Sequence, residues 1–221
     1  MIRKFVKNVV RRVIPAFDRR VRRYEAAYAE YAEKKLRMRT DEELNLQGRG
    51  LKEIRDVFND LSIPYYIFFG TLLGAVREGD FIRWDWDIGI AVKTEDVMPK
   101  QDLLHKALER AGFDVAEHIS NKADFKINAL KYGARYEIVG FFKLWNMRYR
   151  TGFRYPDAFF RGNTEVTLRG ERYHTVENPE EFLVWMYGNW RTPIRSCNKS
   201  EYIKSKARTN HITQWMLKLV P

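Results

Sequence analysis

The sequence predicts an α/β fold in the broad sense: helices flank a mixed sheet, as in α+β domains. An amphipathic helical arm precedes this domain at the N-terminus. Residues 65–69, YYIFF, form an apolar run that follows a proline, as expected of a buried strand. Residues 94–112 carry apolar side chains at helical spacing. Two more strands are expected at 124–130 and 135–142, joined by a turn at Tyr132-Gly133.

Composition divides the chain of 221 residues into three parts. Residues 1–39 contain 13 Lys or Arg and four acidic residues, so they carry +9 of the net charge of +11. We expect a basic arm at 1–39, a globular domain at 40–197 and a basic helix at 198–221 that packs on the domain or the arm. The single Cys197 excludes an intramolecular disulfide, which is typical of a reducing compartment.

Residues 1–24 read as a basic amphipathic helix, with a bend predicted at Pro15. No apolar run approaches the ~20 residues needed to span a bilayer. Such a helix can lie on an anionic membrane surface. Its apolar stripe can instead pack on the domain or on a second copy in a homo-oligomer. A specific nucleic-acid partner is not expected, because no recognised nucleic-acid motif accompanies the stripe.

The next helix is expected to begin at Thr40, a candidate N-cap, and to end before Pro64. Its apolar stripe suits packing against a sheet. Gly48 and Gly50 weaken this helix in its first half, so the alternative is a helix that is broken there.

The most informative stretch is residues 69–90, FGTLLGAVREGDFIRWDWDIGI. Asp85 and Asp87 alternate with Trp84 and Trp86, which predicts a strand with both carboxylates on one face and the tryptophans on the other. Carboxylates about 7 Å apart on a strand can share a hard cation. The alternative is a hairpin with two solvated aspartates.

Gly70-Thr71 precedes this strand and opens a short predicted helix. The turn can offer N–H groups and a hydroxyl to a phosphate. Arg77 follows and can contact phosphate, or form a salt bridge with a nearby acid. An Asp-x-Asp strand beside a phosphate-binding turn indicates phosphoryl-transfer chemistry.

GTLLGAVR followed by F-I-x-W-D-x-D-I resembles the signature of the LicD/fukutin family, which includes bacterial phosphocholine transferases and fukutin-related ribitol-phosphate transferases. Tyr187-Gly188-x-Trp190-x-x-Pro193 resembles the family's C-terminal motif, so the resemblance covers roughly residues 41–195. It implies a nucleotidyltransferase-like core with a fold similar to that of DNA polymerase beta. The departures from the family pattern are Glu78 for His, Arg83 for Pro, Trp86 for Asp or Tyr, and Gly89 where many members have a further Asp.

In that superfamily a third carboxylate projects from a neighbouring strand, and Glu137 is the candidate here. Otherwise Glu137 is an exposed strand residue paired with Arg135. Lys126 on the adjoining strand can meet a phosphate, or simply be exposed. Residues 143–165 are rich in Arg and aromatic groups and show no clear periodicity, so we expect an irregular loop. It can bind a charged substrate, through Arg150 and Arg154 in particular, or be a packed surface loop.

The resemblance implies a metal-dependent enzyme that transfers a phospho-alcohol group from a CDP-linked alcohol donor to a glycan or lipid-linked glycan acceptor. Mg²⁺ or Mn²⁺ would be held by Asp85, Asp87 and Glu137. Substrate phosphate would be contacted by Gly70, Thr71, Arg77, Lys126, Arg150 and Arg154. The arm predicts a cytoplasmic enzyme attached to the inner face of the membrane. The alternatives are an enzyme that transfers a nucleotide itself and an inactive membrane-associated scaffold.

Overall fold

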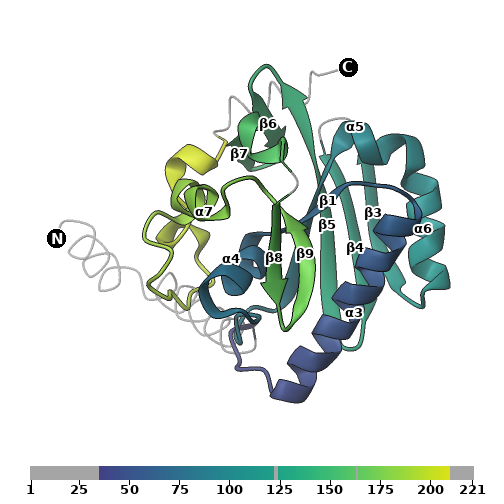
Figure 1. Ribbon diagram of the computed structural model, residues 1–221, viewed down its shortest axis with the longest axis horizontal. Coiled ribbons are helices and arrows are strands. Elements are labelled where there is room, and N and C mark those ends of the chain that lie inside the picture. The colour runs from purple at the N-terminus through teal and green to yellow at the C-terminus, as the bar shows by residue number, and fades with distance from the viewer. Residues whose placement is uncertain (1–34, 122–123, 163, 210–221) are drawn as a thin grey trace, which may run out of the picture.

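The computed structural model describes residues 35–121, 124–162 and 164–209. The predicted membrane-binding helix of residues 1–24 lies outside the described residues, as does the chain beyond residue 209. The described part is a mixed α/β domain, as predicted, with helices flanking a twisted sheet (Figure 1).

The sheet has the strand order β1-β2-β5-β4-β3, and β6 and β7 continue it from the end of β5. β2 and β5 are parallel, whereas the other neighbours are antiparallel. The predicted strands at 65–69, 124–130 and 135–142 are confirmed. The bounds are β1 Tyr65–Phe68, β2 Asp87–Lys93, β3 Asp114–Asn121, β4 Asp124–Lys131, β5 Ala134–Leu144, β6 Met147–Arg150 and β7 Phe153–Pro156.

Alternation along β5 defines the two faces of the sheet. The Tyr136 hydroxyl donates a hydrogen bond of 3.1 Å to the backbone oxygen of Gln47 in α3 (Asp41–Asp60), so even-numbered residues face that helix. α3 and α6 (Gln101–Arg110) lie side by side on this face (Figure 1). Arg135 and Glu137 therefore point to the opposite face.

That opposite face is covered by α4 (Phe69–Glu78) and α7 (Pro179–Tyr187). The hairpin of β8 (Thr164–Leu168) and β9 (Glu171–Thr175) lies against β1 and contacts α3, where Arg55 Nη1 is 2.9 Å from a Glu171 carboxylate oxygen. An aromatic cluster forms the core beneath α4 and α7. The ring of Phe68 lies 4.9 Å from that of Phe182, 5.3 Å from Phe141 and 5.4 Å from Tyr155, measured between centroids. These packed rings hold α7 on the end of β1.

α3 begins at Thr40 as predicted, with a full capping box: the Thr40 hydroxyl accepts from Glu43 N–H, and the Glu43 carboxylate accepts from Thr40 N–H. The two glycines do not break the helix. A Cβ on Gly50 would lie 2.0 Å from the Tyr136 hydroxyl oxygen, so the helix packs tightly on β5 there.

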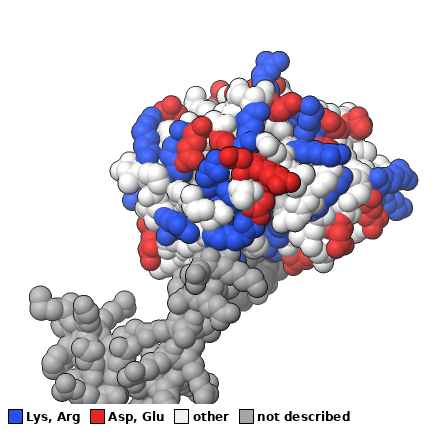
Figure 2. Space-filling view, turned by 90° about the horizontal axis from the view of Figure 1, so that it is seen from below, with Lys and Arg blue, Asp and Glu red and all other residues white. Residues whose placement is uncertain are grey.

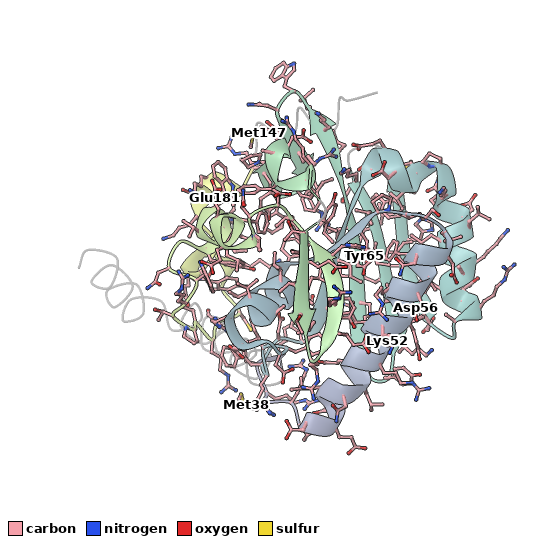
Figure 3. The ribbon with its side chains drawn as sticks, in the orientation of Figure 1. Met38, Lys52, Asp56, Tyr65, Met147 and Glu181 are labelled. Carbon is pink, nitrogen blue, oxygen red and sulfur yellow. The ribbon has the colours of Figure 1, made fainter. Side chains whose placement is uncertain are left out.

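Three predicted elements differ in the structure. Residues 94–112 form two helices, α5 (Thr94–Val97) and α6, separated by a 3₁₀ turn at Met98–Lys100, because Pro99 lacks the N–H that a continuous helix needs. The expected loop at 143–165 is largely the hairpin β6–β7, and Met147, labelled in Figure 3, is the first residue of β6. Residues 198–209 form two 3₁₀ turns, Lys199–Glu201 and Ser205–Ala207, in place of the predicted helix.

The surface of the described domain carries mixed charge. Lys and Arg are interspersed with Asp and Glu over the face seen in Figure 2. Within the described ranges, no helix is both long and apolar enough to cross a membrane.

Candidate active site

The site begins with the loop between α4 and β2, which contacts from distant elements hold in place. Arg169, in the β8–β9 turn, places Nη1 2.7 Å from both carboxylate oxygens of Asp80. The backbone N–H of Arg169 also donates a hydrogen bond of 2.9 Å to the backbone oxygen of Gly79. A Cβ on Gly74 would lie 2.5 Å from the Asp80 carbonyl oxygen, so the loop lies directly on α4. The backbone leading to Asp85 is thus held by α4 and the hairpin together.

Asp85 and Asp87 line one cavity of about 400 Å³, but only Asp87 belongs to the strand. The predicted strand is too long at its start: Asp85 and Trp86 lie in the irregular segment before β2. For that reason Trp84 and Trp86 do not face away from the carboxylates, and both also line the cavity.

Gly70 stands at the beginning of α4, directly against Asp85. An ideal Cβ on Gly70 would lie 1.6 Å from the Asp85 Oδ2 atom, a distance at which the carboxylate would have to move. A glycine is therefore required for the observed approach of Asp85 to the N-terminus of α4.

Thr71 is buried beneath the cavity and does not line it. Its hydroxyl oxygen accepts a hydrogen bond of 2.9 Å from the backbone N–H of Gly89. This contact joins α4 to the first residues of β2, so in this structure Thr71 positions the site.

Gly89 has no room for a larger side chain. A Cβ there would lie 2.9 Å from the Phe68 carbonyl oxygen and 3.1 Å from Cδ2 of Phe69. A carboxylate at this position, as many members of the resembled family have, would require β1 and α4 to move. Close packing of β2 on its neighbours accounts for the glycine.

Glu137 lines the same cavity as the aspartate pair. It is paired in register with Gly89 of β2, so it lies two residues further along the sheet than Asp87. Its Oε1 atom is 3.8 Å from Lys126 Nζ, and Lys126 also pairs with Glu117 at 2.8 Å. Within the part of the chain that the structure describes, no three His, Cys, Asp or Glu side chains form a cluster that could hold a metal ion.

The predicted basic residues are distributed unevenly. Arg77 and Arg150 line the cavity, whereas Lys126 and Arg154 are not among the residues that do. Arg77 donates to Glu78 through Nε at 2.9 Å, which is the predicted salt bridge with a nearby acid. Arg154 Nε donates to the backbone oxygen of Lys206 at 3.0 Å.

Arg150 is 8% exposed, and its Nη2 lies 3.6 Å from Asp124. Its Nε atom is buried and has no hydrogen-bond partner within the described residues. A buried donor of this kind in a cavity wall is suited to an anionic ligand.

Burial raises the pKa of Asp85 from its ordinary value of 3.8 to about 8, and the neighbouring charge of Asp87 adds to the effect. The positive charge of Arg39 opposes the shift. Two adjacent carboxylates that are shielded from water are difficult to ionise together unless a cation compensates them.

Sequence reasoning missed several residues of the cavity. Arg135 donates a hydrogen bond to Asp87 Oδ2 and lies over the Trp86 ring, with Cζ 3.8 Å from the centroid. The partnership depends on Asp87 and Arg135 being in register in the parallel pair β2–β5, which a single sequence does not reveal. The chain also returns after α7 to complete the wall with Trp190, Lys199 and Tyr202.

Comparisons with known proteins define the class of the domain first. Residues 62–183 match the nucleotidyltransferase domain described as LicD/FKTN/FKRP, so the predicted nucleotidyltransferase-like core is confirmed. Because the match covers more than half of the chain, this protein belongs to the LicD/FKTN/FKRP family and carries a transferase domain. None of the curated protein sequences matches the chain.

Solved structures with a similar course of the chain include the antibiotic-resistance factor ANT(2″)-Ia in solution, at 15% identity and a TM-score of 0.46. That match covers 59% of this chain and 65% of the factor, slightly under two thirds. A crystal structure of ANT(2″)-Ia with adenylyl-2″-tobramycin matches at 15% identity and TM-score 0.48, covering 77% and 86% of the two chains. A putative nucleotidyltransferase from Thermotoga maritima matches at 16% identity and TM-score 0.40, covering 62% and 81%.

Proposed function

We propose that this transferase moves a phospho-alcohol group, such as phosphocholine or ribitol phosphate, from a CDP-activated donor to a hydroxyl of a cell-surface glycan or glycolipid. The observation that supports the proposal most is the carboxylate pair Asp85 and Asp87 in a cavity with a basic excess. Of the described residues that line it, five are basic and three are acidic. A donor diphosphate carries both the negative charge and the oxygen atoms that such a cavity would bind.

Two hard oxygen ligands for Mg²⁺ or Mn²⁺, Asp85 and Asp87, line the cavity, and donor phosphates and water would complete the coordination. Glu137 lines the same cavity, and a bound cation would offset the burial and the neighbouring charge of Asp87 that raise the pKa of Asp85. When bound, the ion would stabilise negative charge that develops on the phosphates.

The side chains of the cavity would bind and orient the reactants. Arg150, with its unused buried N–H, would bind a phosphate oxygen of the donor, and Arg77 would assist. The acceptor oxygen would form a bond to the phosphorus that carries the alcohol, while the bond from that phosphorus to CMP breaks. A carboxylate of the cavity would take the proton of the acceptor hydroxyl.

Release of CMP tests the proposal. CDP-choline, CDP-ribitol, CDP-glycerol and CDP-ethanolamine are each supplied with Mg²⁺ and a glycolipid extract. The variant is Asp87→Asn, and the matched control is Asp56→Asn on α3, which lies on the other side of the sheet (Figure 3). We expect CMP from one donor, roughly 100-fold less or lower with Asp87→Asn, and no change with the control, because metal ligands contribute several kcal/mol to such reactions.

Two other results would contradict the proposal. Pyrophosphate release from a nucleoside triphosphate, without CMP release from any CDP-alcohol, would indicate transfer of the nucleotide itself. The absence of both products, together with no metal-dependent nucleotide binding, would favour an inactive scaffold.

We also propose that the arm holds the enzyme on the inner face of the cytoplasmic membrane, where a lipid-linked acceptor lies. The basic amphipathic pattern of residues 1–24 supports this. The full chain should sediment with vesicles of phosphatidylglycerol and not with phosphatidylcholine alone. Replacement of Arg19, Arg20, Arg22 and Arg23 by Gln should abolish this binding, and unchanged sedimentation would contradict the assignment.

A further inference from the structure

Arg135 and Asp87 form an ion pair inside the cavity. They are in register in neighbouring parallel strands, so their side chains leave the sheet on the same face. Arg135 Nη2 donates to Asp87 Oδ2, and each side chain is 24% exposed. The pair is thus partly shielded from water, and a cation already neutralises one of the two carboxylates expected to bind metal.

Trp86 holds the guanidinium of Arg135 by a second contact. The Arg135 Cζ atom is 3.8 Å from the centroid of the Trp86 ring, and Lys35 Nζ is 3.7 Å from the same centroid. Both cations therefore lie within cation–π distance of the Trp86 ring. Trp86 thus retains Arg135 by a cation–π contact that does not depend on Asp87.

Arg135 also has a hydrogen-bond donor that is not used. Its Nε atom is buried and has no partner within the described ranges, which is equally true of Arg150 Nε in the same cavity wall. Buried guanidinium N–H groups prefer an acceptor, and phosphate oxygens match their planar arrangement.

We infer that Arg135 exchanges partners when ligands bind: it neutralises Asp87 in the free protein and binds a phosphate oxygen of the nucleotide once a divalent cation occupies the carboxylates. This inference rests on the proposed function, since it assumes a metal ion at Asp85 and Asp87. A cation on Asp87 competes with the guanidinium for the same oxygen and repels it. Trp86 keeps the released guanidinium within the cavity.

The exchange couples metal binding to nucleotide binding. The metal ion alone must displace Arg135, so its affinity is reduced. With a nucleotide present, the displaced guanidinium gains a new acceptor, and the two ligands strengthen each other's binding. Arg135 is therefore a positioning residue for the nucleotide as well as a competitor of the metal.

Binding of Mn²⁺ to the full chain tests this coupling, measured by electron paramagnetic resonance of the free ion with and without CDP. The variant is Arg135→Met. The matched control is Arg172→Met, which removes the same charge from a side chain of β9 that is 77% exposed. Without CDP we expect Arg135→Met to bind Mn²⁺ about tenfold more tightly than the wild type, because a neighbouring like charge changes ionic equilibria by roughly one logarithmic unit or more. CDP should increase the Mn²⁺ affinity of the variant less than that of the wild type or the control.

A second variant keeps the test decisive if Arg135→Met does not fold. Arg135→Lys keeps the charge and loses the planar donor set, so it should bind Mn²⁺ as the wild type does and bind CDP with Mn²⁺ several-fold more weakly. If the wild type binds Mn²⁺ and Arg135→Met binds it equally or less tightly, the inference is wrong and the proposed metal site stands. If neither protein binds Mn²⁺ with or without CDP, both the inference and the proposed metal site are wrong.

Discussion

At the scale of the residue, close contacts decide which side chains face the cavity. Gly70 permits the Asp85 carboxylate to approach α4, and Gly89 permits β2 to lie against Phe68 and Phe69. The hydroxyl oxygen of Thr71 accepts a hydrogen bond from the Gly89 N–H. Small residues at these points bring two carboxylates into a confined, partly dehydrated space, and the pKa of Asp85 rises as a result.

That raised pKa predicts how stability depends on pH in the absence of metal. Between about pH 4 and about pH 8 the folded protein keeps the Asp85 proton, whereas the unfolded chain, with the ordinary pKa of 3.8, releases it. The folded state binds more protons in this window, so its stability falls as the pH rises. The melting temperature of the wild type in EDTA, relative to that of Asp85→Asn, should therefore decrease from pH 5 to pH 8. A difference that stays constant over this range would contradict the shift.

At the scale of the element, α3 shows how one helix accommodates two glycines of different kinds. A Cβ on Gly48 would lie 3.7 Å from its nearest neighbours, which is ordinary contact. A Cβ on Gly50 would collide with Tyr136, whose hydroxyl oxygen would be only 2.0 Å away. The capping box at Thr40 and the apolar stripe stabilise the helix despite both glycines.

Alanine substitutions should separate these two positions. Gly48→Ala is expected to stabilise the protein by about 0.5–1 kcal/mol, because alanine restricts the unfolded chain more and fits the available space. Gly50→Ala should destabilise it by about 1–3 kcal/mol through overpacking against Tyr136. Urea unfolding of the two variants checks the prediction, and equal effects of the same sign would show that the contact is not rigid.

At the scale of the whole molecule, an ion network around the buried pair Arg148–Asp157 joins segments that are distant in the chain. Arg148 in β6 places Nε 2.8 Å from Asp157 and Nη2 2.7 Å from Glu95 in α5. Asp157 is 2% exposed and also pairs with Lys143 at 2.9 Å. The network fixes the β6–β7 hairpin, and with it Arg150, relative to the sheet.

Removal of the Asp157 side chain should therefore lower the free energy of unfolding. Asp157→Ala leaves the buried Arg148 with one carboxylate partner fewer, and we expect a loss of about 3 kcal/mol of unfolding free energy. The exposed pair of Arg191 and Glu180, 2.7 Å apart, provides the control, because Glu180→Ala should cost less than about 1 kcal/mol. Chemical denaturation compares the two, and similar losses would refute the assignment of a structural role to the network.

The sequence alone was sufficient for the α/β class and for the start of α3 after Thr40. It also predicted strands at 65–69, 124–130 and 135–142, whose ends lie within two residues of the observed ones. Local patterns carry this information, because apolar periodicity, capping residues and turn residues act over a few positions. The same patterns indicated Asp85, Asp87 and Arg150, and the family resemblance indicated Glu137; the fold brings all four to one cavity.

Only the tertiary structure decided which residues meet across the sheet. The pairing of Arg135 with Asp87, the burial of Thr71 and the return of Trp190 and Tyr202 to the cavity all depend on strand register and on packing between distant segments. Residues 147–156 became a hairpin because their core contacts outweigh weak local periodicity. Such contacts join positions far apart in the chain, and no local pattern in a single sequence encodes them.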